Sequence, residues 1–158
     1  MIKELLLYLW ESMPLFIASF VGTLGFAIVF KVKWKYLIPI SVCGFFTYVI
    51  YLSAIFLGCS EFLAALLTSA FVGIVAEALA RIMKAPTIIF SATGIVSIVP
   101  GSFLYYSMRS LLLRDMDGFV YNFKNACLIA AGIVLGIVSI SVVIKLLMSL
   151  LISFKKEK

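Results

Sequence analysis

The segment that decides the fold runs from Pro86 to Ser102 and reads PTIIFSATGIVSIVPGS. It is apolar enough to enter the hydrocarbon core of a membrane, yet Pro100 and Gly101 lie inside the apolar run. Proline removes a backbone donor and clashes with the preceding helical turn, and glycine lets the chain leave helical geometry. We therefore expect a membrane helix that is kinked or broken at Pro100 and Gly101.

The composition of the whole chain indicates a membrane protein. Of its 158 residues, 65% are hydrophobic and 13% are charged, and the mean hydropathy is +1.23. Soluble domains contain about 45–50% apolar and about 25% charged residues, so this chain has too few charges to cover the surface of a soluble globule. We expect a single transmembrane domain over residues 1–158.

The apolar runs predict the number of membrane spans. A helix needs about 20 largely apolar residues to cross the hydrocarbon core, and the alternating polar pattern of a membrane barrel is absent. We expect an all-α integral membrane protein, a bundle of about five transmembrane helices of which the fourth is kinked or broken. The five expected spans are residues 13–30, 36–57, 62–80, 86–108 and 126–144.

The lysines and arginines predict the orientation of these spans. With five spans, nine of them fall on one side of the membrane and four on the other. Because cytoplasmic loops carry an excess of Lys and Arg, we expect a multi-pass protein of the cell (plasma or inner) membrane, with its N-terminus outside and its C-terminus cytoplasmic. The larger set is Lys31, Lys33, Lys35, Arg81, Lys84, Lys145, Lys155, Lys156 and Lys158, and the smaller is Lys3, Arg109, Arg114 and Lys124.

One loop of the larger set mixes basic and aromatic residues, with Lys31, Lys33, Trp34 and Lys35 lying between two long apolar runs. A nucleic-acid site would require a basic face on a soluble element, so we expect no nucleic-acid partner. Basic residues near an anionic bilayer surface contribute about 1 kcal/mol each. The segment is therefore interpreted as a membrane-interface anchor.

The broken helix is the first candidate for function. In transporters, broken helices lie on the substrate path, where a half-helix N-terminus meets anionic groups, and Gly101 and Ser102 would supply that N-terminus. Gly94 and Ser97 lie just upstream on the same segment. The alternative is a proline kink whose freed backbone groups are satisfied by neighbouring helices and by serine hydroxyls.

Small residues predict where helices pack. Ser69 and Gly73 recur at a spacing of four in the third run, and Gly132 and Gly136 form a G-x-x-x-G in the fifth. Such spacing places small residues on one helix face and lets two helices approach closely.

Glu77 lies in the third run, four residues before Arg81. A carboxylate inside a membrane helix is a candidate for proton or cation coupling. The favoured interpretation is an interfacial ion pair between Glu77 and Arg81, because the carboxylate lies close to the end of the run.

The sequence argues against an enzyme. The chain has no histidine, and its three cysteines, Cys43, Cys59 and Cys127, form no C-x-x-C pair. Histidine-based triads are therefore excluded, and neither a metal site nor a cofactor is expected. There is also no G-x-S-x-G nucleophile motif.

A few motifs resemble a known family over nearly the whole chain. The chain resembles the short, YjjB-like subunit of the split form of the ThrE-type threonine/serine exporters. Members of that family often have asparagine after the phenylalanine that ends the first span, where this chain has Lys31, and a proline where it has Ser97. The resemblance rests on Gly25-Phe26-Ala27 with Phe30, on Pro86 after Arg81 and Lys84, and on Val99-Pro100-Gly101 followed by Tyr105.

The resemblance implies a function. It implies export of small polar metabolites, either threonine/serine-type amino acids or a dicarboxylate such as succinate, driven by the proton-motive force. It also implies a separate long hydrophobic subunit as partner, and places Pro100, Gly101, Ser102 and Tyr105 near the substrate pathway. A higher oligomer and a non-transporting accessory or assembly subunit are the alternatives that the sequence leaves open.

Overall fold

The computed structural model describes residues 2–156, with the side chains at positions 2, 3, 5, 6, 9 and 150–156 outside the description. Every regular element in that part of the chain is helical, which confirms the expected all-α class. The elements in chain order are α1 (Ile2–Glu11), α2 (Met13–Val29), α3 (Trp34–Phe56), α4 (Glu61–Met83), α5 (Thr87–Gly94), the 3-10 turn η1 (Val96–Ile98), α6 (Gly101–Leu112) and α7 (Met116–Lys156).

Within residues 2–156, three helices are long and apolar enough to cross a membrane, namely α3, α4 and α7. The pair α5–η1 and α6 adds a fourth if the two bent parts are one span, and α2 is a shorter apolar helix of 17 residues. The expected span 126–144 is only the middle of α7, which has 41 residues. At 1.5 Å per residue α7 is about 60 Å long, roughly twice the thickness of the hydrocarbon core.

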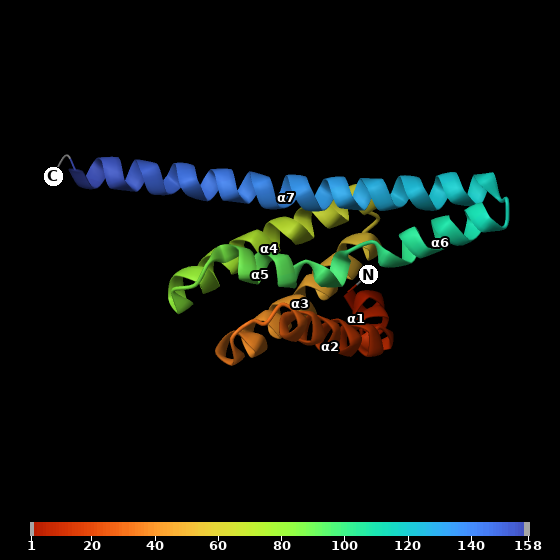
Figure 1. The fold of residues 1–158 in the computed structure, drawn as a ribbon, viewed down its shortest axis with the longest axis horizontal. Helices are drawn as coiled ribbons and strands as arrows, with labels where there is room; N and C mark the ends of the chain where they lie inside the picture. Colours follow the sequence, from red (N-terminus) through yellow and green to blue (C-terminus); the bar gives the residue numbers. More distant parts are fainter. Residues whose placement is uncertain (1, 157–158) are drawn as a thin grey trace.

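Helix α4 is the centre of the arrangement, because it packs against α3, α5 and α7. Figure 1 shows α7 running along the whole length of the molecule, with α6 folded back along its N-terminal part and α4 beneath its middle. Helices α2 and α3 pack against each other on the far side of α4 from α7. The C-terminal part of α7 extends beyond the other helices (Figure 1).

Small residues set the close contact between α4 and α7. A Cβ added to Gly132 would lie 2.6 Å from the carbonyl oxygen of Phe62, and one added to Gly136 would lie 2.6 Å from that of Leu66. The Ser69 hydroxyl donates a hydrogen bond to the Gly132 carbonyl across this contact, at 3.2 Å. Backbone therefore meets backbone, and van der Waals contact is gained along the interface without the hydrophobic effect that drives packing in water.

Gly73, the other small residue of this set, faces the same helix. A Cβ at Gly73 would lie 3.2 Å from the Ile140 side chain. All four residues that the sequence assigned to packing are thus in the α4–α7 contact.

The expected break in the fourth apolar run is confirmed. Helix α5 ends at Gly94, η1 follows, and α6 starts at Gly101 with an axis bent by 51°. Pro100 immediately precedes the first residue of α6, where its missing N–H costs no helical hydrogen bond. The chain leaves the α-helical conformation after Gly94, six residues before Pro100.

The role expected for Gly101 needs correction. Among the glycines of the described chain, only Gly58 has a left-handed φ, at 83°, so Gly101 does not use the conformational freedom of glycine. A Cβ there would also meet open space. The break comes from Pro100 and from the burial of Ile98, which is 5% exposed and packs with Ala65 and Ile129.

Basic residues end three of the helices in an unusual backbone conformation. Lys31, Lys84 and Arg114 follow α2, α4 and α6 with φ of 54°, 50° and 58°. A left-handed residue at this position lets the next amides bond to the last carbonyls of the helix, and a cation there interacts favourably with the helix dipole. Figure 1 places the α2–α3 and α4–α5 turns at one end of the bundle and the α3–α4 and α6–α7 turns at the other.

Among the basic residues whose side chains the structure describes, one group lies by the α2–α3 and α4–α5 turns at one end of the bundle, namely Lys31, Lys33, Lys35, Arg81 and Lys84, and Arg109 and Arg114 lie by the α6–α7 turn at the other. The side chains of Lys3, Lys155 and Lys156, and all of Lys158, lie outside the described residues.

Candidate functional site: a cavity at the helix break

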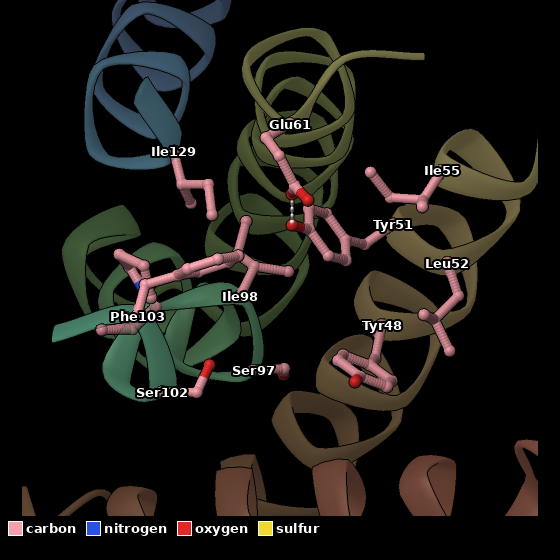
Figure 2. Close-up of a pocket in the computed structure, with 12 residues that line it drawn as sticks. Tyr48, Tyr51, Leu52, Ile55, Glu61, Ser97, Ile98, Ser102, Phe103 and Ile129 are labelled. Atoms are coloured by element: carbon pink, nitrogen blue, oxygen red, sulfur yellow. Dashed lines mark hydrogen bonds between the residues drawn. The ribbon is translucent and has the colours of Figure 1, made fainter. Parts of the chain in front are cut away.

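The helix break opens on a cavity of about 340 Å³. Its walls come from α3, from the first residue of α4, from the η1–α6 break and from one residue of α7 (Figure 2). The lining mixes apolar side chains with two tyrosines, two serines and one carboxylate, and small-molecule sites likewise combine an apolar lining with a few placed polar groups. The residues that line it are Tyr48, Tyr51, Leu52, Ile55, Glu61, Ser97, Ile98, Val99, Pro100, Ser102, Phe103 and Ile129.

The N-terminus of α6 forms one wall of the cavity, through Pro100, Ser102 and Phe103. The first amides of a helix lack partners within the helix, and the helix dipole gives this end a partial positive charge. An anionic group in the cavity would therefore meet backbone donors at this wall.

A carboxylate lies on a different wall. The Tyr51 hydroxyl of α3 donates a hydrogen bond to Glu61, the first residue of α4 (Figure 2). Ser60 caps this helix by accepting a hydrogen bond from the Leu63 amide at 3.4 Å, and the helix N-terminus stabilises the Glu61 charge. Figure 2 shows Glu61 and Tyr51 apart from Ser97 and Ser102, with Ile98 and Phe103 drawn between them in this view.

Hydroxyl groups fix the break to α2 and α3. The Ser97 hydroxyl is 3.1 Å from the Gly44 carbonyl oxygen, to which it donates, and 3.2 Å from the Thr23 hydroxyl. The Ser19 hydroxyl donates to the same carbonyl at 2.8 Å. A Cβ at Gly44 would lie 2.1 Å from the Thr23 hydroxyl oxygen, so the absence of a side chain at Gly44 allows α2 this close.

The residues that the sequence placed near a substrate pathway separate into two groups. Ser97, Pro100 and Ser102 line the cavity, and Gly101 lies between two lining residues. Gly94 instead packs between α3 and α4, because a Cβ there would lie 3.0 Å from Val72 and 3.4 Å from Cys43. Tyr105 is 66% exposed on α6 and is not one of the lining residues.

Glu77 lies far from this cavity, near the opposite end of α4. Its carboxylate forms an ion pair with Arg81 at 2.9 Å and accepts a hydrogen bond from the Thr87 hydroxyl at 3.0 Å. The contact with Thr87 joins the end of α4 to the start of α5. This geometry favours the interfacial-anchor interpretation of Glu77 over the coupling interpretation.

The basic and aromatic segment at the α2–α3 turn is exposed. Trp34 is 85% exposed, and the Lys35 ammonium lies 4.8 Å from the centre of the Tyr36 ring. Lys31 and Lys33 are exposed on the same turn. All four lie where an interface anchor requires them, at one end of the apolar bundle.

Sequence reasoning missed Glu61, Tyr48 and Tyr51. Glu61 belongs to a short connection between two apolar runs, where a carboxylate is ordinarily solvated or stabilises a helix start. The available signal was the spacing of Tyr48 and Tyr51, three residues apart on one helix face. Only the packing of α3 on the start of α4 brings this face to the carboxylate.

The fold and the cavity define a class: a multi-pass α-helical membrane protein with a broken helix beside a partly open cavity, and broken helices lie on the substrate paths of transporters. Exposed large apolar side chains along the spans, such as Ile38, Ile74, Val134 and Val138, agree with a lipid environment. The family model described as Threonine/Serine exporter, ThrE, matches residues 15–143. The chain belongs to this family of membrane transport proteins, which confirms the resemblance. No curated protein and no solved structure matches the chain.

Proposed function

We propose that the chain is a subunit of a membrane transporter that exports small polar metabolites, either threonine/serine-type amino acids or a dicarboxylate such as succinate. The observation that carries the proposal is the cavity at the break between η1 and α6, with a helix N-terminus on one wall and a carboxylate on another. Its volume of about 340 Å³ is at the lower end of the range of about 300–1,000 Å³ for small-molecule sites.

In this proposal the substrate carboxylate binds at the N-terminus of α6. A metabolite that crosses the bilayer must exchange its hydration for protein groups, because an unpaired charge in an apolar medium is very costly. The free amides at Ser102 and Phe103 and the hydroxyl of Ser102 are donors suited to a carboxylate. The substrate pathway then includes Ser97, Pro100, Gly101 and Ser102.

The chain acts together with a separate long subunit of the same family and uses the proton-motive force. Glu61 is the one charged residue among the described residues that line the cavity, and a coupled pump needs further ionisable groups, so the partner would supply the remaining ones. The basic end of the bundle, with Lys31, Arg81 and Lys145, would face the cytoplasm. The N-terminus would then lie outside, as the charge distribution predicts.

The test is efflux from cells preloaded with threonine, serine and succinate. The cells express this chain, its long partner, or both, with and without a protonophore. Efflux that requires both chains and collapses with the proton gradient is the expected result. If this chain changes efflux in no combination, the transporter proposal is overturned and an accessory role in assembly replaces it.

Variants at the break test the site assignment. We expect the double variant Pro100→Ala, Gly101→Ala to continue the helix through the break, since alanine restores the missing backbone donor and favours helix. Efflux should be lost while the amount of protein in the membrane stays the same. The matched control is Gly25→Ala, because a Cβ at Gly25 meets open space outside the cavity. Efflux that persists in the double variant would remove the break from the pathway.

A further inference from the structure

Among the described residues, the Glu61 carboxylate has one hydrogen-bond donor and no ion-pair partner. Tyr51 donates to it, and in the described part of the chain the ion pair recorded is that of Glu77 with Arg81. Glu61 is partly buried and lines the cavity rather than facing away from the bundle. An ionised carboxylate with several lone pairs and one donor can accept further hydrogen bonds.

The groups around Glu61 suit a cation. The rings of Tyr48 and Tyr51 stack with centroids 6.4 Å apart and line the same cavity. The faces of aromatic rings attract ammonium groups electrostatically. A charged hydrogen bond from an ammonium to a carboxylate is stronger than a neutral one. Neither tyrosine carries a positive charge that would compete with an ammonium ion for the Glu61 carboxylate.

We propose that Glu61 is the specificity-determining residue of the cavity, and that it binds the ammonium group of the substrate beside the Tyr48 and Tyr51 rings. This inference rests on the proposed function and deepens it by choosing between the two substrate classes. The ammonium binds at Glu61, and the carboxylate binds at the N-terminus of α6. Glu61 and the first turn of α6 line the same cavity, so in this proposal one zwitterion occupies both.

A dicarboxylate fits this cavity poorly. One of its carboxylates can bind at the N-terminus of α6, but the second would face Glu61. Like charges that meet in a partly desolvated site repel each other, which weakens binding. Glu61 therefore accounts for the discrimination in two ways: it attracts the ammonium group of an amino acid, and it repels the second carboxylate of succinate.

The experiment measures equilibrium binding to membrane vesicles from cells that express the full chain with its long partner. The ligands are radiolabelled L-threonine, N-acetyl-L-threonine, which lacks the ammonium charge, and succinate. The variants are Glu61→Gln, which removes the charge and keeps the shape, and Glu61→Asp, which keeps the charge on a shorter side chain. Glu11→Gln is the matched control, because this exposed carboxylate lies outside the cavity.

We expect wild-type vesicles to bind threonine more tightly than N-acetyl-L-threonine or succinate. Glu61→Gln should weaken threonine binding on the order of 10- to 100-fold, the effect of losing a hydrogen bond to a charged group. The same variant should leave N-acetyl-L-threonine unchanged and should bind succinate more tightly than the wild type. The effects on the binding free energy of removing the ligand's ammonium charge and of removing the Glu61 charge should thus be non-additive.

Glu61→Asp shows whether a loss reflects charge or folding, because it should recover part of the threonine affinity that Glu61→Gln loses. The inference is overturned if wild-type vesicles bind no threonine, if Glu61→Gln and Glu11→Gln bind it alike, or if Glu61→Gln weakens all three ligands equally.

Efflux separates this inference from the proposed function. If threonine binding depends on Glu61 but no combination of chains exports threonine, the transporter proposal fails and the ammonium site stands. If threonine efflux occurs and Glu61→Gln leaves its concentration dependence unchanged, the ammonium site fails and the transporter proposal stands.

Discussion

Replacing Gly136 with alanine should push α4 and α7 apart where they touch. The new Cβ would lie 2.6 Å from the carbonyl oxygen of Leu66, 3.0 Å from the amide nitrogen of Ala70 and 2.0 Å from the Ser69 hydroxyl oxygen. The serine side chain can rotate away, but the backbone of α4 cannot. To reach an ordinary separation of about 3.4 Å from the carbonyl, the helices must part locally by about 0.8 Å.

The expected magnitude follows from these contacts. Overpacking of a tight interface costs about 1–3 kcal/mol, and the hydrogen bond from Ser69 to the Gly132 carbonyl is worth about 1 kcal/mol. We expect the free energy of unfolding to fall by about 2–3 kcal/mol. For a chain of this size the melting temperature should then fall by roughly 4–12 °C.

Thermal unfolding in detergent, followed by circular dichroism, measures this change. Gly22→Ala is the control, because a Cβ at Gly22 in α2 meets nothing within 4 Å, and alanine favours a helix over glycine by about 1 kcal/mol. Gly22→Ala should melt at or above the wild-type temperature. If Gly136→Ala melts within 2 °C of the wild type, a threshold set by about 0.5 kcal/mol, the close-contact reasoning is refuted.

Three further predictions concern other parts of the chain. Lys31→Asn should raise the free energy of unfolding in neutral detergent by about 0.5 kcal/mol, because Lys31 has a φ of 54° and asparagine adopts this conformation more readily; a lower melting temperature would contradict this. Ser97→Ala should lower the free energy of unfolding by about 1 kcal/mol, since the hydrogen bond to the Gly44 carbonyl is lost while Ser19 still donates to it; an unchanged melting curve would show that this bond contributes nothing. Glu77→Gln should leave efflux unchanged and lower the free energy of unfolding by at most about 1 kcal/mol, because the Glu77–Arg81 pair is partly exposed. Abolished efflux with normal protein levels would instead make Glu77 a coupling group.

Much of the fold could be predicted from the sequence because bilayer physics leaves few alternatives. A run such as 36–57 has to be helical in lipid, since no water is present to satisfy its backbone. Pro100 has to interrupt the fourth run, since its ring clashes with the preceding turn. Gly132 and Gly136 are visible as a packing face from spacing alone, and α4 lies against them in the structure.

The lengths of the helices were less predictable. The window 126–144 ends where hydropathy falls, but α7 begins at Met116 and pairs with α6. Asp115 caps its start by accepting a hydrogen bond from the Gly118 amide at 3.0 Å. Hydropathy cannot distinguish the polar residues of a helix that extends past the bilayer from the residues of a loop.

The candidate site was predicted only in part. Pro100, Ser97 and Ser102 carry local signals, a helix breaker and small polar residues in an apolar run, and they line the cavity. Glu61 carries no such signal, because a carboxylate in a short connection is ordinarily solvated. Tyr51 and Glu61 are ten residues apart across a turn, and only the packing of α3 on α4 makes them partners.

The sequence by itself determined the membrane class, the helical architecture, the break at Pro100 and the grouping of basic residues at one end. These follow from composition and from local backbone chemistry, which act within a few residues of the chain. The tertiary structure alone decided which polar groups share a cavity. Helix packing brings the α6 N-terminus, Glu61 and two tyrosines together from three separate segments, and no rule of local spacing encodes contacts between residues so far apart in the chain.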